Sequence, residues 1–215
     1  CILDCFSLLY LNDILHEQIP SLVAFLTSEM SCIEDKREKW ADFKTKRNNC
    51  LCQILGVDPA WGIQAGSLIN FDIDPERKLI LLNYSSTAHN LLHEIPNGWT
   101  PMLRMMRGLV YSYENPGQFE GVKLVSRGFE KFFNQSELPE NSLTQLGEVT
   151  AGQKFMCVAK EDGHMIEYFR INGMLCATTR GKLNSPSAIE SLSLLDDKTF
   201  QEVQKLVSAQ FGIDI

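Results

Sequence analysis

The stretch CVAKEDGHMIEYFRINGMLCATTRG, residues 157–181, predicts a β-hairpin that follows a lysine-bearing turn. Asn172-Gly173 lies between two β-prone runs, HMIEYFRI and MLCATTRG. Both turn residues tolerate positive φ, so we expect the two runs to pair as antiparallel strands. The apolar run FMCVA indicates an earlier, buried strand that ends at Lys160, and EDG then forms a turn. The local order is therefore strand, KEDG turn, strand, NG turn, strand.

Two interpretations of Lys160 are open. A K-x-D-G match occurs by composition in roughly one chain in twenty of this length, so a solvated turn explains it. The alternative is a nucleophile, because Lys160 and Asp162 of an extended segment point to the same side. Burial and nearby cations would lower the pKa of the lysine amine and raise its uncharged fraction. The candidate cations are Arg107, Lys131 and Arg180.

One reaction suits a lysine, a carboxylate two residues later, a glycine and several separate cations. That reaction is attack on the α-phosphate of a nucleotide. The amine would displace pyrophosphate in line, while the cations and a divalent metal would stabilise charge on the phosphoryl oxygens and the leaving group. Neither G-x-x-x-x-G-K-[ST] nor G-x-G-x-x-G occurs in the sequence. The expected product is a lysyl-nucleotide.

The composition is that of a globular protein of one or two domains. The chain has 215 residues and a formal charge of -7, with 44% hydrophobic and 22% charged residues. Its longest apolar stretch, CFSLLYLNDILHEQIPSLVAFL, is interrupted by polar residues and a proline, so no membrane span is predicted. No secretory signal is visible. The start at Cys1 instead of Met suggests a fragment or a processed piece.

Cysteine and histidine spacing gives little support for a metal site. The seven cysteines lack paired C-x-x-C motifs, which favours reduced thiols in an intracellular protein of the cytoplasm or nucleus. His89 and His93 lie four residues apart and could share a helix face. Without a second ligand pair, zinc is the weaker interpretation. The metal ligands therefore remain unknown.

Residues 1–77 are predicted to form a helical N-terminal extension of unassigned role. Helical periodicity over residues 8–30 is broken at Pro20, and residues 34–55 form an amphipathic pattern that ends at Gly56. The basic residues of the second pattern fit a solvated helix face or a nucleic-acid contact, and the solvated face is the more frequent case.

From residue 66 onward, the chain mixes strand and helix patterns. The β-like runs are GSLINFDID, KLILLNYSS, RGLVYSYE and GVKLVSRG, with a helical or loop segment around residues 89–99. After the hairpin, Ser185-Pro186 begins a helix with Ser187 and Glu190 as a capping box. Residues 198–211 form a further amphipathic helix. The predicted fold class is α+β.

Four sequence blocks, MRGLVY, LVSRGFEKFFN, FMCVAKEDGHMIEYF and ATTRG, follow one another in this order. Together they resemble the nucleotidyltransferase domain of the RNA ligases, closest to the T-even bacteriophage RNA ligase 1 family. The resemblance runs from about residue 78 to about residue 191, just over half of the chain. It implies antiparallel sheets with helices in an ATP-grasp-like arrangement, with residues 78–215 as the front part of the domain. The family's later blocks, a glutamate-bearing strand and a strand with two lysines, would follow residue 215, so we expect the domain to be incomplete on its C-terminal side.

The resemblance also implies roles for single residues. Lys160 would be the catalytic residue that carries AMP. The implied ATP-binding residues are Arg107, Lys131, Lys160, Asp162, Gly163 and Arg180. The match at Arg180 is looser, because relatives can carry lysine there and arginine changes the geometry. His164 stands where relatives often have serine, and Phe132 and Phe133 are interpreted as core packing.

The implied function is ATP-dependent RNA ligation in RNA repair or tRNA processing. With ATP and Mg²⁺ as cofactors, Lys160 would take AMP, pass it to a 5′-phosphate RNA end, and a 3′-hydroxyl would displace it. The expected partners are RNA ends, of tRNA or another structured RNA, with no membrane or protein partner. This chain alone could be inactive without the later blocks.

Two alternative functions stay open. The ligase module of fungal-type tRNA ligases has an R-G-[FY]-x-K-F-F-N block that resembles residues 127–134, but tends to have asparagine where Asp162 stands. The other alternative is a non-catalytic remnant that binds ATP or RNA. Such a remnant would form no covalent adduct.

Overall fold

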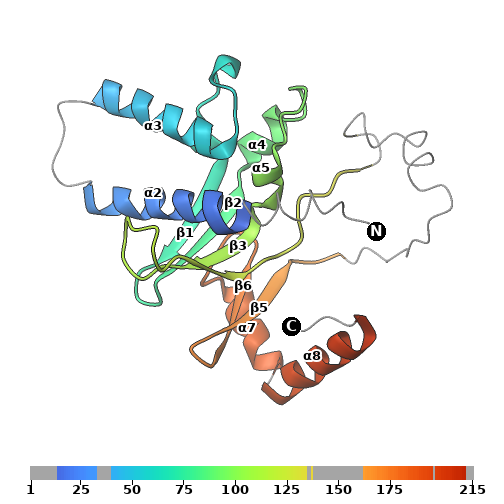
Figure 1. The fold of residues 1–215 in the computed structure, drawn as a ribbon. Helices are drawn as coiled ribbons and strands as arrows, with labels where there is room; N and C mark the ends of the chain where they lie inside the picture. Colours follow the sequence, from blue (N-terminus) through green and yellow to red (C-terminus); the bar gives the residue numbers. More distant parts are fainter. Residues whose placement is uncertain (1–13, 33–39, 135–136, 138–161, 196, 212–215) are drawn as a thin grey trace.

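A computed structural model describes residues 14–32, 40–134, 137, 162–195 and 197–211 of the chain (Figure 1). These residues form an α+β fold with antiparallel sheets, which confirms the predicted class. The strands are β1 Ile69–Asp74, β2 Leu79–Tyr84, β3 Arg107–Ser112, β4 Lys123–Ser126, β5 Ile166–Ile171 and β6 Met174–Thr179. The helices are η1 Ile14–Gln18, α2 Ile19–Cys32, α3 Trp40–Leu55, η2 Pro59–Trp61, η3 Ala65–Ser67, α4 Ser86–Leu91, α5 Pro101–Met105, α7 Pro186–Leu194 and α8 Asp197–Phe211.

Strand β2 lies inside a four-stranded antiparallel sheet of order β1-β2-β3-β4, and all six of its residues are buried. Side chains alternate along a strand. Ile80 and Leu82 therefore join a large hydrophobic cluster on one face, and Leu79 and Leu81 join a smaller cluster on the other. A strand covered on both faces needs apolar residues at every position, which explains the continuous run KLILLNYSS.

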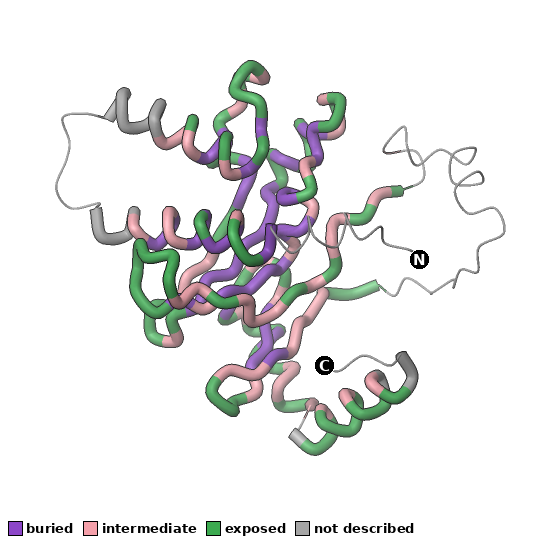
Figure 2. The backbone as a smooth tube through the Cα atoms, in the orientation of Figure 1, coloured by how far each residue is buried: buried purple, intermediate pink, exposed green. Residues whose placement is uncertain are grey.

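Helices cover the face with the large cluster. Leu22 of α2, Leu55 of α3 and Met102 of α5 are members of this cluster, and Figure 2 shows buried residues concentrated in the sheet and on the helical segments that face it. Tyr111 of β3 is fully buried there, and its hydroxyl donates a hydrogen bond to the carbonyl of Leu15 at 2.7 Å. The N-terminal helices thus pack directly on the sheet.

The hairpin β5-β6 covers the opposite face. Phe169 and Cys176 of the hairpin, together with Leu183, pack against Val110 and its neighbours in the small cluster. Asn172 and Gly173 have φ values of 49° and 80°, so the predicted turn with two positive φ angles is confirmed.

Strand β1 holds the segment that follows the hairpin. The Asp72 carboxylate accepts a hydrogen bond from the backbone N–H of Leu183 at 2.8 Å and one from Lys182 Nζ at 3.3 Å. Asp74 accepts a hydrogen bond from Asn184 Nδ2 at 3.1 Å. The first strand of the sheet is therefore tied to residues more than a hundred positions later.

Two helix starts are explained by capping and proline. The predicted capping box of Ser187 and Glu190 is wrong, because Pro186 is already in the first turn of α7 and the cap position falls on Ser185. Ser185 Oγ accepts a hydrogen bond from the Ala188 N–H at 3.1 Å. Pro20 lies at the second position of α2, directly after the π-helix η1, so the predicted break in the helical pattern falls where the helix changes type.

The predicted boundary between residues 77 and 78 falls in the turn that joins β1 to β2, which pair along their full length. The division at this point stays a prediction. In the part of the chain that the structure describes, no helix combines the length and apolar character needed to cross a membrane.

Candidate functional site

Three predicted cations come from separate elements and meet near the start of β3. Arg107 is the first residue of β3, Lys131 lies in the loop after β4, and Arg180 follows β6. Burial lowers the pKa of Lys131, and the charges of Arg107 and Arg180 lower it further, while Glu137 partly offsets these effects. Positive charges that lie close enough to lower the pKa of a neighbouring lysine together attract a polyanion.

Lys131 is held in an aromatic setting. Its side chain is 8% exposed, and Nζ lies 4.4 Å from the centre of the Phe133 ring and 5.5 Å from that of Trp99. Its backbone N–H donates a hydrogen bond to the Arg104 carbonyl at 2.7 Å, and Nζ lies 3.8 Å from a Glu137 carboxylate oxygen. These contacts fix the ammonium group in a partly desolvated position.

His93 and Trp99 pack against Phe133 and so complete the aromatic surroundings of Lys131. The indole Nε1–H of Trp99 donates a hydrogen bond to His93 Nδ1 at 3.1 Å, and Phe133 contacts both rings edge to face. Burial lowers the pKa of His89, and Lys131 and His93 lower it further. The rings of His89 and His93 lie 4.9 Å apart, but no group of three or more metal-binding side chains occurs among the described residues.

Arg107 and Arg180 each lie over an aromatic ring. The Arg107 guanidinium is 4.9 Å from the centre of the Phe132 ring, and its Nη1 is 3.4 Å from Met165 Sδ. Phe132 is 57% exposed, so its predicted place in the core is wrong, because stacking on Arg107 keeps it at the surface. Phe133 does pack against the large cluster. Arg180 is 5.4 Å from the Tyr84 ring centre.

A family model described as RNA ligase, that of the T4 RNA ligase 1 family, matches residues 105–211, about half of the chain. The matched stretch contains all three of these cations. The chain belongs to this RNA ligase family. The predicted family is therefore confirmed, and no curated protein is significantly similar to the chain.

The predicted nucleophile of this RNA ligase, Lys160, lies outside the described residues, as does the strand expected before it. Asp162 and Gly163 are described and are exposed. Gly163 has a φ of 154°, which favours glycine, and a Cβ there would meet nothing within 4 Å. Among the described residues, no atom therefore encloses Gly163.

Tyr84 and Trp99 lie in the same site of this RNA ligase but were missed in the sequence, whereas His93 was considered there only as a zinc ligand. The Tyr84 hydroxyl accepts a hydrogen bond from Arg180 Nη1 at 3.5 Å, and its ring packs edge to face on Trp99. A tyrosine at the end of a buried strand also fits plain core packing, so no local pattern marks it.

Glu167 is a further residue that the sequence analysis missed. It lies on β5, and burial raises the pKa of its carboxyl group to about 7, against the opposing effects of a Ser126 hydrogen bond and the Arg107 charge. In the sequence, a glutamate within the alternating run HMIEYF resembles any solvent-facing strand position.

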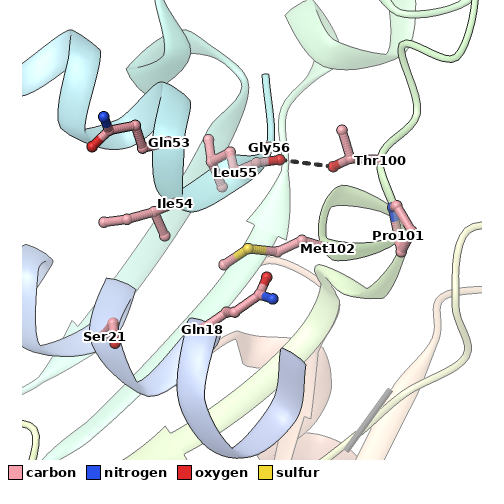
Figure 3. Close-up of a pocket in the computed structure, with 9 residues that line it drawn as sticks. All are labelled: Gln18, Ser21, Gln53, Ile54, Leu55, Gly56, Thr100, Pro101 and Met102. Atoms are coloured by element: carbon pink, nitrogen blue, oxygen red, sulfur yellow. Dashed lines mark hydrogen bonds between the residues drawn. The ribbon is translucent and has the colours of Figure 1, made fainter. Parts of the chain in front are cut away.

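The ligase also has a pocket away from these residues. Its volume is about 460 Å³, and it lies between the start of α2, the end of α3 and the start of α5 (Figure 3). Figure 3 shows the hydrogen bond from Thr100 Oγ1 to the Leu55 carbonyl, 2.9 Å long, which bridges α3 and α5 at its edge. None of its lining residues is a predicted ATP-site residue.

Proposed function

We propose that this chain is the nucleotidyltransferase region of an ATP-dependent RNA ligase in which Lys160 becomes adenylated. The observation that carries the proposal is the convergence of Arg107, Lys131 and Arg180 from three separate elements inside the family-matched residues. Three cations with aromatic neighbours suit a nucleoside triphosphate, which offers phosphates and a flat base.

In the proposed reaction, the uncharged amine of Lys160 attacks the α-phosphorus of ATP. A P–N bond forms as the P–O bond to pyrophosphate breaks, and the amine loses its proton to solvent or a nearby base. The cations stabilise charge that develops on the phosphoryl oxygens and on the leaving group. The lysyl-AMP then passes AMP to a 5′-phosphate RNA end, and attack by a 3′-hydroxyl releases AMP and seals the strand.

We propose that Mg²⁺ arrives with ATP. Mg²⁺ keeps several waters and is commonly held by one or two carboxylates together with substrate phosphates. Asp162 is an exposed carboxylate in the predicted turn, and the described residues contain no cluster of three or more metal-binding side chains. When bound, Mg²⁺ would neutralise phosphate charge, and Asp162 is the residue we propose to contact it.

The substrates we propose are RNA ends of tRNA or another structured RNA. The cysteine pattern favours a reducing intracellular compartment, the cytoplasm or the nucleus. Residues 78–215 remain our proposed limits for the front part of the nucleotidyltransferase domain.

The test is covalent labelling. The protein is mixed with Mg²⁺ and ATP labelled at the α-phosphate, denatured, and separated by size. We expect a labelled band that Lys160→Ala abolishes. Lys123→Ala is the matched control, because Lys123 is exposed on β4 and its ion pair with Glu114 is long, at 3.8 Å.

The same assay on a chain extended beyond residue 215 separates the alternatives. Label only in the extended chain would mean that residues 1–215 are an incomplete catalytic unit. If neither folded chain is labelled, adenylation is refuted, and ATP or RNA binding without an adduct would favour the non-catalytic remnant.

A further inference from the structure

The carboxyl group of Glu167 is enclosed by the backbone at Gly108 and Gly128. Ser126 Oγ donates a hydrogen bond to Glu167 Oε2 at 2.8 Å. The other oxygen, Oε1, is buried and has no hydrogen-bond partner among the described residues. A Cβ added to Gly128 would lie 2.1 Å from Oε1, and one added to Gly108 would lie 2.6 Å from it. Two glycines from different segments therefore leave room for a single carboxyl group.

The same two glycines also lie close to the backbone of Arg107 and Arg180. The Cβ position of Gly128 is 2.8 Å from the Arg107 carbonyl, and that of Gly108 is 3.4 Å from Arg180 Cα. Glu167 thus lies where the start of β3, the loop after β4 and the end of β6 come together. Each of these three segments carries or adjoins one of the cations of the site.

The charged side chains on the surrounding elements are cationic or already paired. Arg107 comes from β3 and Arg180 follows β6, whereas Arg127, next to Gly128, forms an ion pair with Glu130. Burial raises the pKa of Glu167 to about 7, so the carboxyl group changes its charge close to neutral pH. The Arg107 charge acts on Glu167, so a buried charge on Glu167 changes the attraction of Arg107 for an anion more than an exposed charge would.

We propose that Glu167 is a positioning residue of the ATP site, which packs between Gly108 and Gly128 beside Arg107 and, by its buried charge, sets the affinity of the site for the triphosphate. The inference rests on the proposed function, because it takes Arg107 and Arg180 as ATP contacts. Neutral Glu167 leaves Arg107 its full attraction for phosphate. Ionised Glu167 offsets one positive charge, so ATP affinity falls as the pH rises. By linkage, bound ATP favours the protonated carboxyl group.

The experiment measures the rate of self-adenylation against ATP concentration from about pH 6 to about pH 9, where KM is the half-saturating ATP concentration and kcat is the maximal rate constant of the single covalent event. The proteins are the unaltered chain, Glu167→Gln and the matched control Glu120→Gln, whose side chain is exposed. In the unaltered chain and the control, we expect KM for ATP to rise about three- to tenfold across this range relative to Glu167→Gln. The ionisation of ATP itself is common to all three proteins and cancels in this comparison.

The rate constant provides a separate readout. We expect kcat to rise with pH in all three proteins, because Lys160 must lose its proton in each. A purely structural role of Glu167 would not remove the pH dependence of KM while leaving that of kcat. The inference is overturned if KM depends on pH equally in Glu167→Gln and in the unaltered chain.

A second measurement needs neither the variant nor the covalent step. The Glu167 carboxyl carbon is followed by NMR through a pH titration of the unaltered chain, with and without ATP. We expect titration near neutral pH and an upward shift of the pKa when ATP is bound. Titration at an ordinary glutamate pKa, or no response to ATP, would overturn the inference.

Calorimetric ATP binding to Lys160→Ala over the same pH range separates the two proposals. Binding whose pH dependence disappears in Lys160→Ala/Glu167→Gln, with no label in the unaltered chain, supports the role of Glu167 and refutes adenylation. Lys160-dependent label in the unaltered chain, together with ATP binding that is equally pH-dependent in Lys160→Ala and Lys160→Ala/Glu167→Gln, supports adenylation and refutes the role of Glu167. No ATP binding at any pH refutes both.

Discussion

On one face of the four-stranded sheet, Leu82 and Tyr111 pack under the N-terminal helices, whereas on the other face Leu81 and Val110 pack against the β5-β6 hairpin. The first cluster is broad and draws on residues from η1 to β3. The second is small and lies on the side of the sheet where the hairpin carries Glu167 in β5 and leads to Arg180 after β6.

The difference separates stability from positioning. The broad cluster contains most of the buried hydrophobic residues of the described chain, so we expect it to contribute most of the hydrophobic free energy. The small cluster mainly fixes where the hairpin lies relative to β3. Both faces share the strands β2 and β3, so the site inherits its rigidity from the core.

The largest expected effect compares adjacent residues of β2 that face opposite clusters. Leu81 and Leu82 are both fully buried. We expect Leu82→Ala to lower the free energy of unfolding by about 4 kcal/mol and Leu81→Ala by about 2.5 kcal/mol, since the hairpin can shift to fill part of the cavity. Urea unfolding measures both values. Equal losses would mean that the two faces are equally rigid and would break the comparison.

A smaller effect is expected from Gly128→Ala, at the edge of the second face. The added methyl group would meet the Arg107 carbonyl, which is backbone and cannot move aside as a side chain can. We expect a loss of about 2 kcal/mol in the free energy of unfolding. Gly181→Ala is the control, because a Cβ there meets nothing within 4 Å. Thermal unfolding compares the two, and a neutral Gly128→Ala would contradict the close approach of the two segments.

The smallest expected effect is the pH dependence of stability due to Glu167. Burial raises the pKa of this carboxyl group from 4.5 to about 7 on folding, so the folded state binds the proton more tightly. The contribution to stability is full below about pH 4.5 and is lost as the pH rises through about 7. We expect Glu167→Gln to gain about 1 to 2 kcal/mol relative to the unaltered chain between about pH 5 and pH 8, after allowing for partial solvent screening.

Chemical unfolding of the unaltered chain, Glu167→Gln and the control Glu120→Gln at several pH values tests this last expectation. Parallel stability curves for all three proteins would show that Glu167 does not titrate differently in the folded and unfolded states. The hairpin side of the sheet would then stabilise the fold through packing alone, with no pH-dependent contribution to the free energy of unfolding.

The sequence predicted those features that depend on short segments. Asn172-Gly173 specifies its turn through backbone preferences alone, and the apolar run of β2 indicates burial on both faces. The cations Arg107, Lys131 and Arg180 were found because each belongs to a family-like block. The structure brings these three residues together, as the hypothesis of a shared site requires.

The missed features depend on contacts between distant segments. Glu167 is marked by Ser126 and Gly128, some forty residues earlier, and no local pattern joins these positions. Phe132 was predicted to pack in the core, together with Phe133. Its exposure follows from the Arg107 guanidinium, whose position depends on how β3 pairs.

The hydrogen bonds from Leu183 and Lys182 to Asp72 bear on where the polypeptide can be cut. The family match begins at residue 105, yet a chain shortened to that point would lose β1 and β2 and leave β3 with a bare, apolar edge. Such edges pair with other chains and aggregate. A cut at residue 78 would keep β2 but release the loop that Asp72 anchors. For a soluble, ordered ligase fragment, the N-terminal limit should therefore lie before β1. The helices that precede β1 should also be kept, because they cover one apolar face of the sheet.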